Sequence, residues 1–336
     1  MKKNILYALV ACLAFSFAAC SDDPMDATEK HVYGPNENPF LEIDQNATIS
    51  ISQEFPVQRI EEVQEIKLAD YAEKFQSQLG MTVDETISAL STGKVVFYPI
   101  NVARGQWLRT SAPTKGTNGW HFNSAGGVCE ASASSFSVEL DVNKKAILIS
   151  CNSDIALGGY SFNVGFAIDN GTEYGDYVRF SDNFTVTDPS KIVVSVKMAA
   201  ADWAGNAIKF ADYKDAIEVC TDMTLDEFNE AVNAGVDGPM ELILVDKNGN
   251  WDPNFEAADA YYTANGLGYW LTSESIPVVW EGNDMTYYIE TGNGQLNFGR
   301  ASGSAYNGKT IPLRFVYTVK ADHTRYIEFI VSVVME

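Results

Sequence analysis

Basic residues and histidines are scarce in this chain of 336 residues. Lys and Arg total 23 against 45 Asp and Glu, which gives a formal net charge of −22, and the three histidines are His31, His121 and His323. Nucleic-acid binding needs concentrated positive charge, so the acidic balance excludes that class of partner. Three dispersed histidines do not form a His-rich metal site. Apolar residues still make up 46% of the chain, enough for packed cores.

Cysteine is also scarce, with five in the chain. Cys12 and Cys20 lie in or next to an apolar N-terminal run, whereas Cys129, Cys151 and Cys220 are widely spaced with no Cys-x-x-Cys. An odd number of dispersed cysteines predicts buried thiols, and neither a disulfide framework nor a zinc site. A bridge between Cys129 and Cys151 stays an alternative, provided that the two face each other on adjacent strands.

Recognised catalytic motifs are missing. The sequence has no Gly-x-Ser-x-Gly, no His-Glu-x-x-His, no phosphate-binding loop and no dinucleotide-binding fingerprint. The chain is therefore predicted not to be an enzyme and to need no cofactor. A carbohydrate hydrolase remains an alternative, because two carboxylates about 5–9 Å apart suffice for it and need no sequence motif.

One long apolar run is present, over residues 5–17, after Lys2 and Lys3 and before Ala18-Ala19-Cys20. This is the plan of a secretory signal, and the run is shorter than the ~20 residues of a membrane span. Phe17-Ala18-Ala19-Cys20 resembles the bacterial lipoprotein box, which implies a signal peptide over residues 1–19 and an acylated Cys20. The acidic residues after Cys20 resemble the export signal of Bacteroidota lipoproteins, which implies the outer face of the outer membrane. A periplasm-facing lipoprotein is the alternative.

Two segments repeat each other at an offset of 142 residues. Residues 66–71 (IKLADY) match residues 208–213 (IKFADY), and residues 81–85 (MTVDE) match residues 223–227 (MTLDE). A period of this length is that of a domain and not of a solenoid repeat. We therefore predict a flexible tether over residues 20–40, a first module over residues 41–188 and a second over residues 189–336.

The predicted fold class is mainly β with short helices (α+β): two tandem homologous antiparallel β-sandwich domains, each opened by a helical pair. In the first module one helix ends at Gly80 and the next begins at the capping box Thr82-x-x-Glu85, which Thr224-x-x-Glu227 repeats. Short β-branched or aromatic runs between turns predict the strands. They cover residues 47–52, 95–100, 137–141, 146–150 and 160–168, then 192–197, 240–245, 286–290, 311–319 and 326–334.

This layout resembles the tandem domain-of-unknown-function surface lipoproteins of Bacteroidota. Such proteins often belong to polysaccharide-utilisation systems, in which surface lipoproteins capture glycans for an outer-membrane transporter. The resemblance implies that kind of role and supplies no catalytic residue. It covers residues 66–336 and depends on Leu68-Ala69-Asp70-Tyr71, Met81-Thr82, Gly93, Gly119-Trp120 and Ala264-Asn265-Gly266-Leu267-Gly268-Tyr269-Trp270.

Several aromatic residues lie in polar, turn-rich stretches. A sugar ring has an apolar C–H face and polar edges, so it suits an exposed aromatic plane beside amides and charged groups. Trp107 and Trp251 are predicted to be such planes on loops. Trp120 and Trp270 recur in both modules and are predicted to be core anchors. The predicted ligand-binding residues are Arg104, Trp107, Trp251, Tyr262, Asn265 and Tyr269.

An acidic loop is the weak candidate for a metal site. Asp246, Asn248, Asn250 and Asp252 alternate like the oxygen ligands of a calcium loop. Trp251 stands where such a loop has Gly, and no Glu follows at its twelfth position. Since Asn248-Gly249 is also a strong hairpin signal, a plain turn is favoured over calcium.

Together these features predict a lipid-anchored surface protein that binds an oligo- or polysaccharide without turning it over. The expected partners are the glycan, the membrane through the lipid alone, and an outer-membrane transporter complex, with no nucleic acid. The alternative is a structural or adhesive surface module without a small ligand.

Overall fold

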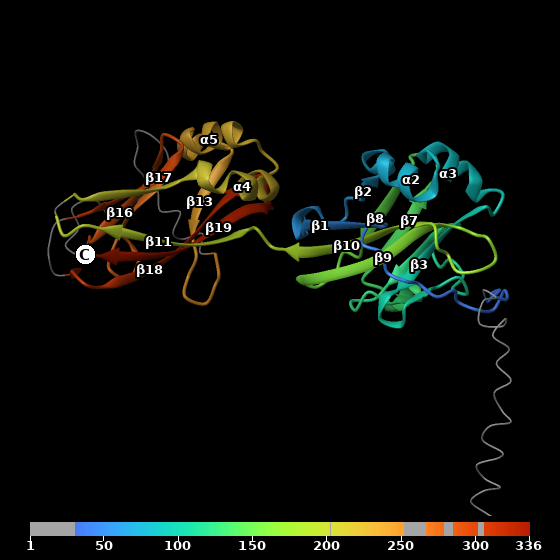
Figure 1. Ribbon diagram of the computed structural model, residues 1–336. Coiled ribbons are helices and arrows are strands. Elements are labelled where there is room, and N and C mark those ends of the chain that lie inside the picture. The colour runs from blue at the N-terminus through green and yellow to red at the C-terminus, as the bar shows by residue number, and fades with distance from the viewer. Residues whose placement is uncertain (1–30, 202, 252–266, 279–284, 302–305) are drawn as a thin grey trace, which may run out of the picture. The chain divides into compact units, whose positions relative to one another are not determined.

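The computed structural model describes residues 31–201, 203–251, 267–278, 285–301 and 306–336, which form two compact units (Figure 1). The first unit comprises the described residues up to Gln53, Glu61–Ile155 and Gly159–Phe184. The second comprises Glu54–Ile60, Ala156–Gly158 and Thr185–Glu336. The predicted signal peptide and the lipidation site Cys20 lie outside the described residues.

The first unit is built on two five-stranded sheets, with strand orders β1-β10-β9-β3-β4 and β2-β8-β7-β5-β6. Its strands are β1 (Thr48–Pro56), β2 (Gln64–Lys67), β3 (Val95–Asn101), β4 (Gln106–Trp107), β5 (Gly119–Phe122), β6 (Val128–Cys129), β7 (Phe136–Asp141), β8 (Ala146–Cys151), β9 (Gly158–Ile168) and β10 (Tyr177–Thr187). Its helical segments are η3 (Leu68–Tyr71), α2 (Ala72–Leu79), α3 (Val83–Leu90), η4 (Val102–Arg104) and η5 (Ala131–Ala133), and η2 (Val57–Arg59) belongs to the second unit.

The second unit repeats this plan, with strand orders β11-β19-β18-β13 and β12-β17-β16-β14-β15. Its strands are β11 (Lys191–Met198), β12 (Gly205–Lys209), β13 (Met240–Leu244), β14 (Gly268–Leu271), β15 (Pro277–Val278), β16 (Tyr287–Gly292), β17 (Gln295–Arg300), β18 (Thr310–Val319) and β19 (Asp322–Met335). Its helical segments are η6 (Phe210–Tyr213), α4 (Lys214–Thr221), α5 (Leu225–Asn233) and η7 (Gly235–Asp237).

The two units share one strand order. The order β11-β19-β18-β13 in the second unit corresponds to β1-β10-β9-β3 in the first. The second sheets correspond in the same way, strand by strand. The predicted fold class, two tandem β-sandwich domains each with a helical pair, is confirmed. One pairing differs from the prediction: β11 runs parallel to β19, so this sheet is mixed and not purely antiparallel.

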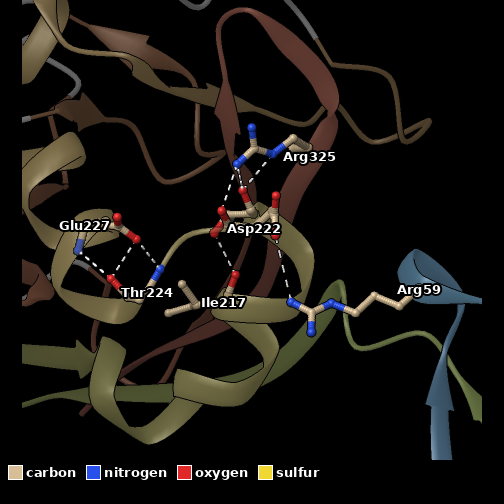
Figure 2. Close-up of polar contacts among 7 residues, drawn as sticks. Arg59, Ile217, Asp222, Thr224, Glu227 and Arg325 are labelled. Carbon is tan, nitrogen blue, oxygen red and sulfur yellow. Dashed lines mark hydrogen bonds and ion pairs between the residues drawn. The ribbon is translucent and has the colours of Figure 1, made fainter. Parts of the chain in front are cut away.

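The helix boundaries follow the predicted capping signals. Thr82 accepts a hydrogen bond from the Glu85 N–H and the Glu85 carboxylate accepts one from the Thr82 N–H, a complete capping box. Thr224 and Glu227 form the same box in the second unit (Figure 2). In the described part of the chain, no helix has the length and apolar character needed to cross a membrane.

The apolar core of the second unit lies between its two sheets and under its helices. Phe315 and Phe329 of one sheet stack at 5.3 Å between ring centroids, and both are fully buried. Phe228 of α5 packs edge-on against Tyr317 at 5.7 Å. Rings from both sheets and the helices therefore interlock in a single cluster.

The three cysteines of the described residues are free. The proposed bridge between Cys129 and Cys151 is wrong, because Cys129 pairs with His121 whereas Cys151 pairs with Phe136. His121 and the inward-facing Phe136 belong to opposite faces of one sheet, so the two thiols do not face each other.

Residues 20–40 were expected to include a flexible tether, but residues 33–40 are bonded to the first unit. The Tyr33 N–H donates to the Gly171 carbonyl at 3.2 Å, and the Trp107 N–H donates to the Pro39 carbonyl at 2.9 Å. Arg109 also donates to the Glu37 carbonyl. Residues 33–40 are therefore attached to the first unit, because these backbone groups satisfy one another.

Candidate functional site

The loop that carries Trp251 is a tight hairpin closed by Asp246. The Asp246 Oδ1 atom accepts hydrogen bonds from the backbone N–H groups of Asn248 and Asn250, each at 2.8 Å. Gly249 takes the left-handed conformation, with φ of 87°, which a side chain rarely adopts. An isolated bridge between Val245 and Trp251 then returns the chain to the sheet.

The Trp251 ring lies on the outer face of the β11-β19-β18-β13 sheet. It meets the Tyr326 ring edge-on at 4.9 Å between centroids, with an interplanar angle of 80°. The centroid of the His323 ring lies 6.1 Å from that of the indole. Beneath these rings is a small buried apolar cluster, Ile243, Val245 and Val316. Trp251 itself is partly exposed, so the indole is both held and accessible.

A close polar contact and an ion pair lie beside the rings. His323 Nε2 lies 2.5 Å from Glu241 Oε1. The Arg314 guanidinium donates through Nε, at 2.9 Å, and through Nη2, at 2.5 Å, to Glu328 Oε1, and Glu328 is only 4% exposed. These contacts orient the polar groups on this face of the sheet. We call Trp251, His323, Tyr326, Arg314 and Glu241 the Trp251 surface.

The prediction from sequence found Trp251 but missed its neighbours. Tyr326 lies on β19 beside Thr318 of β18, and one strand further is Glu241 of β13, which is far from Tyr326 in the sequence. The available signal was the apolar alternation of Ile327, Phe329, Val331 and Val333 in the sequence of β19, which places Tyr326 on the opposite face.

Trp107 is not an exposed platform, and this expectation is wrong. Its side chain is fully buried, on the short strand β4 rather than on a loop. The ring packs edge-on against Tyr174 at 5.4 Å and Tyr177 at 5.7 Å. It also lies against Gly165, where an added Cβ would come within 2.8 Å of the indole. Trp107 is therefore a core residue of the first unit.

The other predicted ligand-binding residues have different outcomes. Arg104 ends the turn η4 and is exposed, but the indole that was to accompany it is buried. Tyr269 is fully buried and its hydroxyl donates to the Leu242 carbonyl at 2.5 Å, so it is not a solvent-facing ring. Tyr262 and Asn265 lie outside the described residues.

The weak calcium candidate has the structure of a turn. Both carboxylate oxygens of Asp246 accept hydrogen bonds from N–H groups of Asn248 and Asn250. These bonds, with the backbone bond from Asn250 foremost, lower the pKa of Asp246. Asp252 lies outside the described residues. In the remaining chain that the structure describes, no group of three or more His, Cys, Asp or Glu is placed to hold a metal ion.

Trp120 and Trp270, predicted to be equivalent, are not in register. Glu65 and Ala207 are equivalent at the 142-residue offset, and following the strand pairing from each leads to Gly119 and Gly268. In the first unit, neighbouring strands pair in the series Glu65, Leu148, Glu139 and Gly119. In the second unit, the corresponding series is Ala207, Asn297, Glu290 and Gly268. The equivalent of Trp120 is therefore Tyr269, and that of Trp270 is His121.

This shift of one residue moves the side chain to the other face of the sheet. Trp120 is 1% exposed and Tyr269 is fully buried, so both are core anchors. Trp270 is partly exposed and packs against Tyr288 at 5.2 Å between ring centroids. The prediction is confirmed for Trp120 and wrong for Trp270.

No protein-family model matches the chain, and no curated protein matches it in sequence. Among solved structures it is similar to SporoSAG from Toxoplasma gondii (8% identity over 86% of this chain and 97% of that chain, TM-score 0.25). It is also similar to the human Desmocollin-1 ectodomain (10% identity over 90% and 41%, TM-score 0.23) and to mouse Cadherin-23 EC22-24 (10% identity over 72% and 53%, TM-score 0.19).

Proposed function

We propose that this protein binds glycan at the Trp251 surface of its second unit, without turning it over. The observation that carries the proposal is the partly exposed indole of Trp251, held edge-on by Tyr326 at 4.9 Å and flanked by fixed polar groups. An aromatic plane beside oriented hydrogen-bonding groups matches the apolar face and polar edges of a sugar ring. An open surface of this kind binds weakly, at about 10 μM to 1 mM, so many anchored copies supply avidity.

We further propose that Cys20 carries the lipid that anchors the protein to the outer membrane, with the folded units at the cell surface. The N-terminal run and the box before Cys20 support this location. A net charge of −22 repels anionic headgroups, so the lipid and not the protein surface holds it there. An outer-membrane transporter complex is the proposed recipient of the glycan.

Affinity electrophoresis tests the binding site. The protein is run through gels with or without a dissolved neutral polysaccharide: a β-glucan, a mannan or a xylan. We expect at least one to retard it, and Trp251→Ala to weaken the retardation about tenfold. Phe40→Ala is the matched control, because Phe40 is an aromatic residue that is 54% exposed and belongs to the first unit. Equal retardation of parent and Trp251→Ala contradicts the assignment of the site.

An adhesive module without a small ligand is the second candidate. The observation that favours it is the burial of Trp107 and Tyr269, which removes two predicted platforms. If no polysaccharide retards the parent protein, this candidate replaces glycan binding. Release of reducing sugar from a retained polysaccharide contradicts the non-catalytic part of the proposal.

A further inference from the structure

The first unit contains a small pocket on the outer face of its β1-β10-β9-β3-β4 sheet, with a volume of about 260 Å³. It is lined by residues 100–103, 108, 125–128, 161 and 163, and we call it the Asn163 pocket. In β9, Phe162 is buried and packs against Phe122 and Phe136 of the other sheet. The side chains of Ser161 and Asn163, on either side of it in the strand, therefore lie on the outer face.

One wall of the Asn163 pocket is the turn between β5 and β6. Asn123 Oδ1 accepts hydrogen bonds from the backbone N–H groups of Ala125 and Gly127, each at 3.0 Å. Gly126 takes the left-handed conformation, with φ of 76°, and a Cβ added there would lie 2.4 Å from the Ser161 carbonyl oxygen. The turn therefore lies directly against β9, and hydrogen bonds within it fix its shape.

A second wall is the turn η4 that follows β3. Asn101 Oδ1 accepts a hydrogen bond from the Arg104 N–H at 3.1 Å, and Gly105 ends the turn in the left-handed conformation. Leu108 is tied to β3, because its N–H donates to the Pro99 carbonyl at 2.9 Å. Both walls are thus held by hydrogen bonds within the first unit, as is usual for ligand pockets that form before the ligand binds.

The lining combines aliphatic surface with amide and hydroxyl groups. Ile100, Leu108 and Val128 contribute the aliphatic surface, and Ser161 and Asn163 contribute polar groups. None of the described residues that line the pocket is Asp, Glu, Lys, Arg or His. Because pockets for drug-sized ligands span about 300–1,000 Å³, this pocket suits a neutral molecule of the size of a single ring.

Asn163 has a polar atom without a partner. Its Oδ1 atom is buried and accepts no hydrogen bond from any described residue. A buried amide oxygen that has given up water without gaining a donor lowers the free energy of unfolding. The terminal amide of an asparagine turns readily about its last bond, so it can offer this oxygen to a hydroxyl group in the pocket.

The equivalent position of the second unit is occupied by Arg314. Ile100 and Val245 are equivalent, because each pairs with the tryptophan of its own turn, and Asn163 and Arg314 lie beside them on the next strand. The Arg314 guanidinium donates to Glu328 Oε1 at 2.9 Å. The polar side chain at this position therefore has a protein partner in the second unit, whereas in the first unit Oδ1 has none among the described residues.

We propose that the Asn163 pocket binds one pyranose residue of a neutral saccharide. The choice of a sugar among small neutral molecules rests on the proposed function, to which the pocket adds a second site and a ligand class. Ile100, Leu108 and Val128 would contact the C–H groups of the sugar ring, while Ser161 and Asn163 would bind its hydroxyls. A uronic acid would bury its carboxylate here without a charged partner, so the pocket excludes it.

Saturation-transfer NMR on the full chain tests the pocket. The probes are glucose, galactose, mannose and xylose, with galacturonic acid as the charged comparison. We expect at least one neutral sugar to bind with a Kd of about 1 mM, and galacturonic acid not to bind. Asn163→Ala should weaken binding about tenfold, and Ser161→Phe should abolish it, because the added ring occupies the pocket. Asn183→Ala is the matched control, since Asn183 is an exposed asparagine of β10 that does not line the pocket.

The outcomes separate this inference from the proposed function, and circular dichroism checks that each variant is folded. If Asn163→Ala and Ser161→Phe weaken sugar binding and Trp251→Ala does not, the pocket is a saccharide site of its own. If both pocket variants bind sugar as the parent does, the pocket is not the site. If no monosaccharide binds while a polysaccharide retards the parent in the gels, the pocket inference is wrong and the proposed function stands. Binding of galacturonic acid overturns the selectivity for neutral sugars.

Discussion

Asp222 of the second unit occupies the position of Gly80 in the first, and both residues end a helix in the left-handed conformation, with φ of 53° and 65°. An aspartate in this conformation is strained by its Cβ, whereas glycine is not. Arg325 offsets this strain, because its guanidinium donates hydrogen bonds to the backbone carbonyls of Thr221 and Asp222 at the end of the helix (Figure 2). Arg59 Nη2 adds an exposed ion pair with Asp222 at 4.0 Å.

Asp222→Gly is therefore expected to stabilise the second unit by about 0.5–1 kcal/mol, because it relieves the left-handed strain. The exposed ion pair that is lost contributes little. Chemical denaturation measures the change. Gly80→Ala is the control. An added Cβ at Gly80 meets nothing within 4 Å, so only the cost of a side chain in the left-handed conformation acts, and it lowers the free energy of unfolding by about 1 kcal/mol. Destabilisation by Asp222→Gly would show that the ion pair dominates.

Asp182 is expected to make the first unit less stable at neutral pH. It is fully buried, and one carboxylate oxygen accepts from the Gln53 side chain at 2.6 Å while the other has no hydrogen-bond partner. Burial raises its pKa from 3.8 to about 6. The folded state therefore favours the protonated carboxyl. The contribution of Asp182 to the free energy of unfolding is greatest below pH 3.8, and it declines as the pH rises from 3.8 to about 6.

Asp182→Asn should remove that decline and raise the free energy of unfolding at pH 7 by roughly 1–3 kcal/mol. Denaturant unfolding of parent and variant at pH 4, 5, 6 and 7 gives the comparison. The difference between them should grow with pH up to about 6 and then stay constant. A difference that is independent of pH would mean that the buried carboxyl does not titrate in this range.

The two capping boxes are expected to weaken in acid. Hydrogen bonds from Thr82 lower the pKa of Glu85, and those from Thr224 lower the pKa of Glu227. Because the folded-state pKa is the lower one, their stabilisation is complete above the unfolded-state pKa of about 4.3 and is lost as the pH falls through the folded-state value. Glu85→Gln and Glu227→Gln should each reduce the loss of unfolding free energy between neutral and acidic pH. Denaturant unfolding of each variant over this pH range measures the effect.

Thr82→Ala and Thr224→Ala provide the corresponding test of the hydroxyls. Each should lower the free energy of unfolding of its own unit by about 1 kcal/mol, because an amide at the start of the helix loses its acceptor. Thermal unfolding followed by circular dichroism measures the effect. Ser88→Ala, a hydroxyl inside α3 that donates to the Asp84 carbonyl, is the control and should leave stability nearly unchanged.

Trp107→Ala should destabilise the first unit strongly, by about 3–5 kcal/mol, because it empties a fully buried ring site between Tyr174 and Tyr177. Trp251→Ala should cost less than about 2 kcal/mol, since that ring is already partly exposed. Denaturant unfolding separates the two variants. Equal stability losses would contradict the different burial of these tryptophans.

Much of the fold was predictable because its signals are local. Helix α2 ends at Gly80 because glycine readily takes the left-handed conformation. Helix α3 begins after Thr82 because the threonine hydroxyl accepts a hydrogen bond from the Glu85 N–H. The strands β3, β7, β8, β9, β13, β16, β18 and β19 coincide with apolar runs. Strand β10 was missed, because Arg179 and Asp182 interrupt its apolar pattern, yet both are buried in the fold.

The sequence alone determined the duplication, the α+β class and the capping of the helices, because matched residues and short-range backbone chemistry specify them. It did not determine which aromatic rings meet solvent. That depends on register between strands far apart in the chain, where one residue's displacement turns a side chain from the core to the surface. Tertiary structure thereby buried Trp107 and Tyr269, and left Trp251, Trp270 and Tyr288 partly exposed.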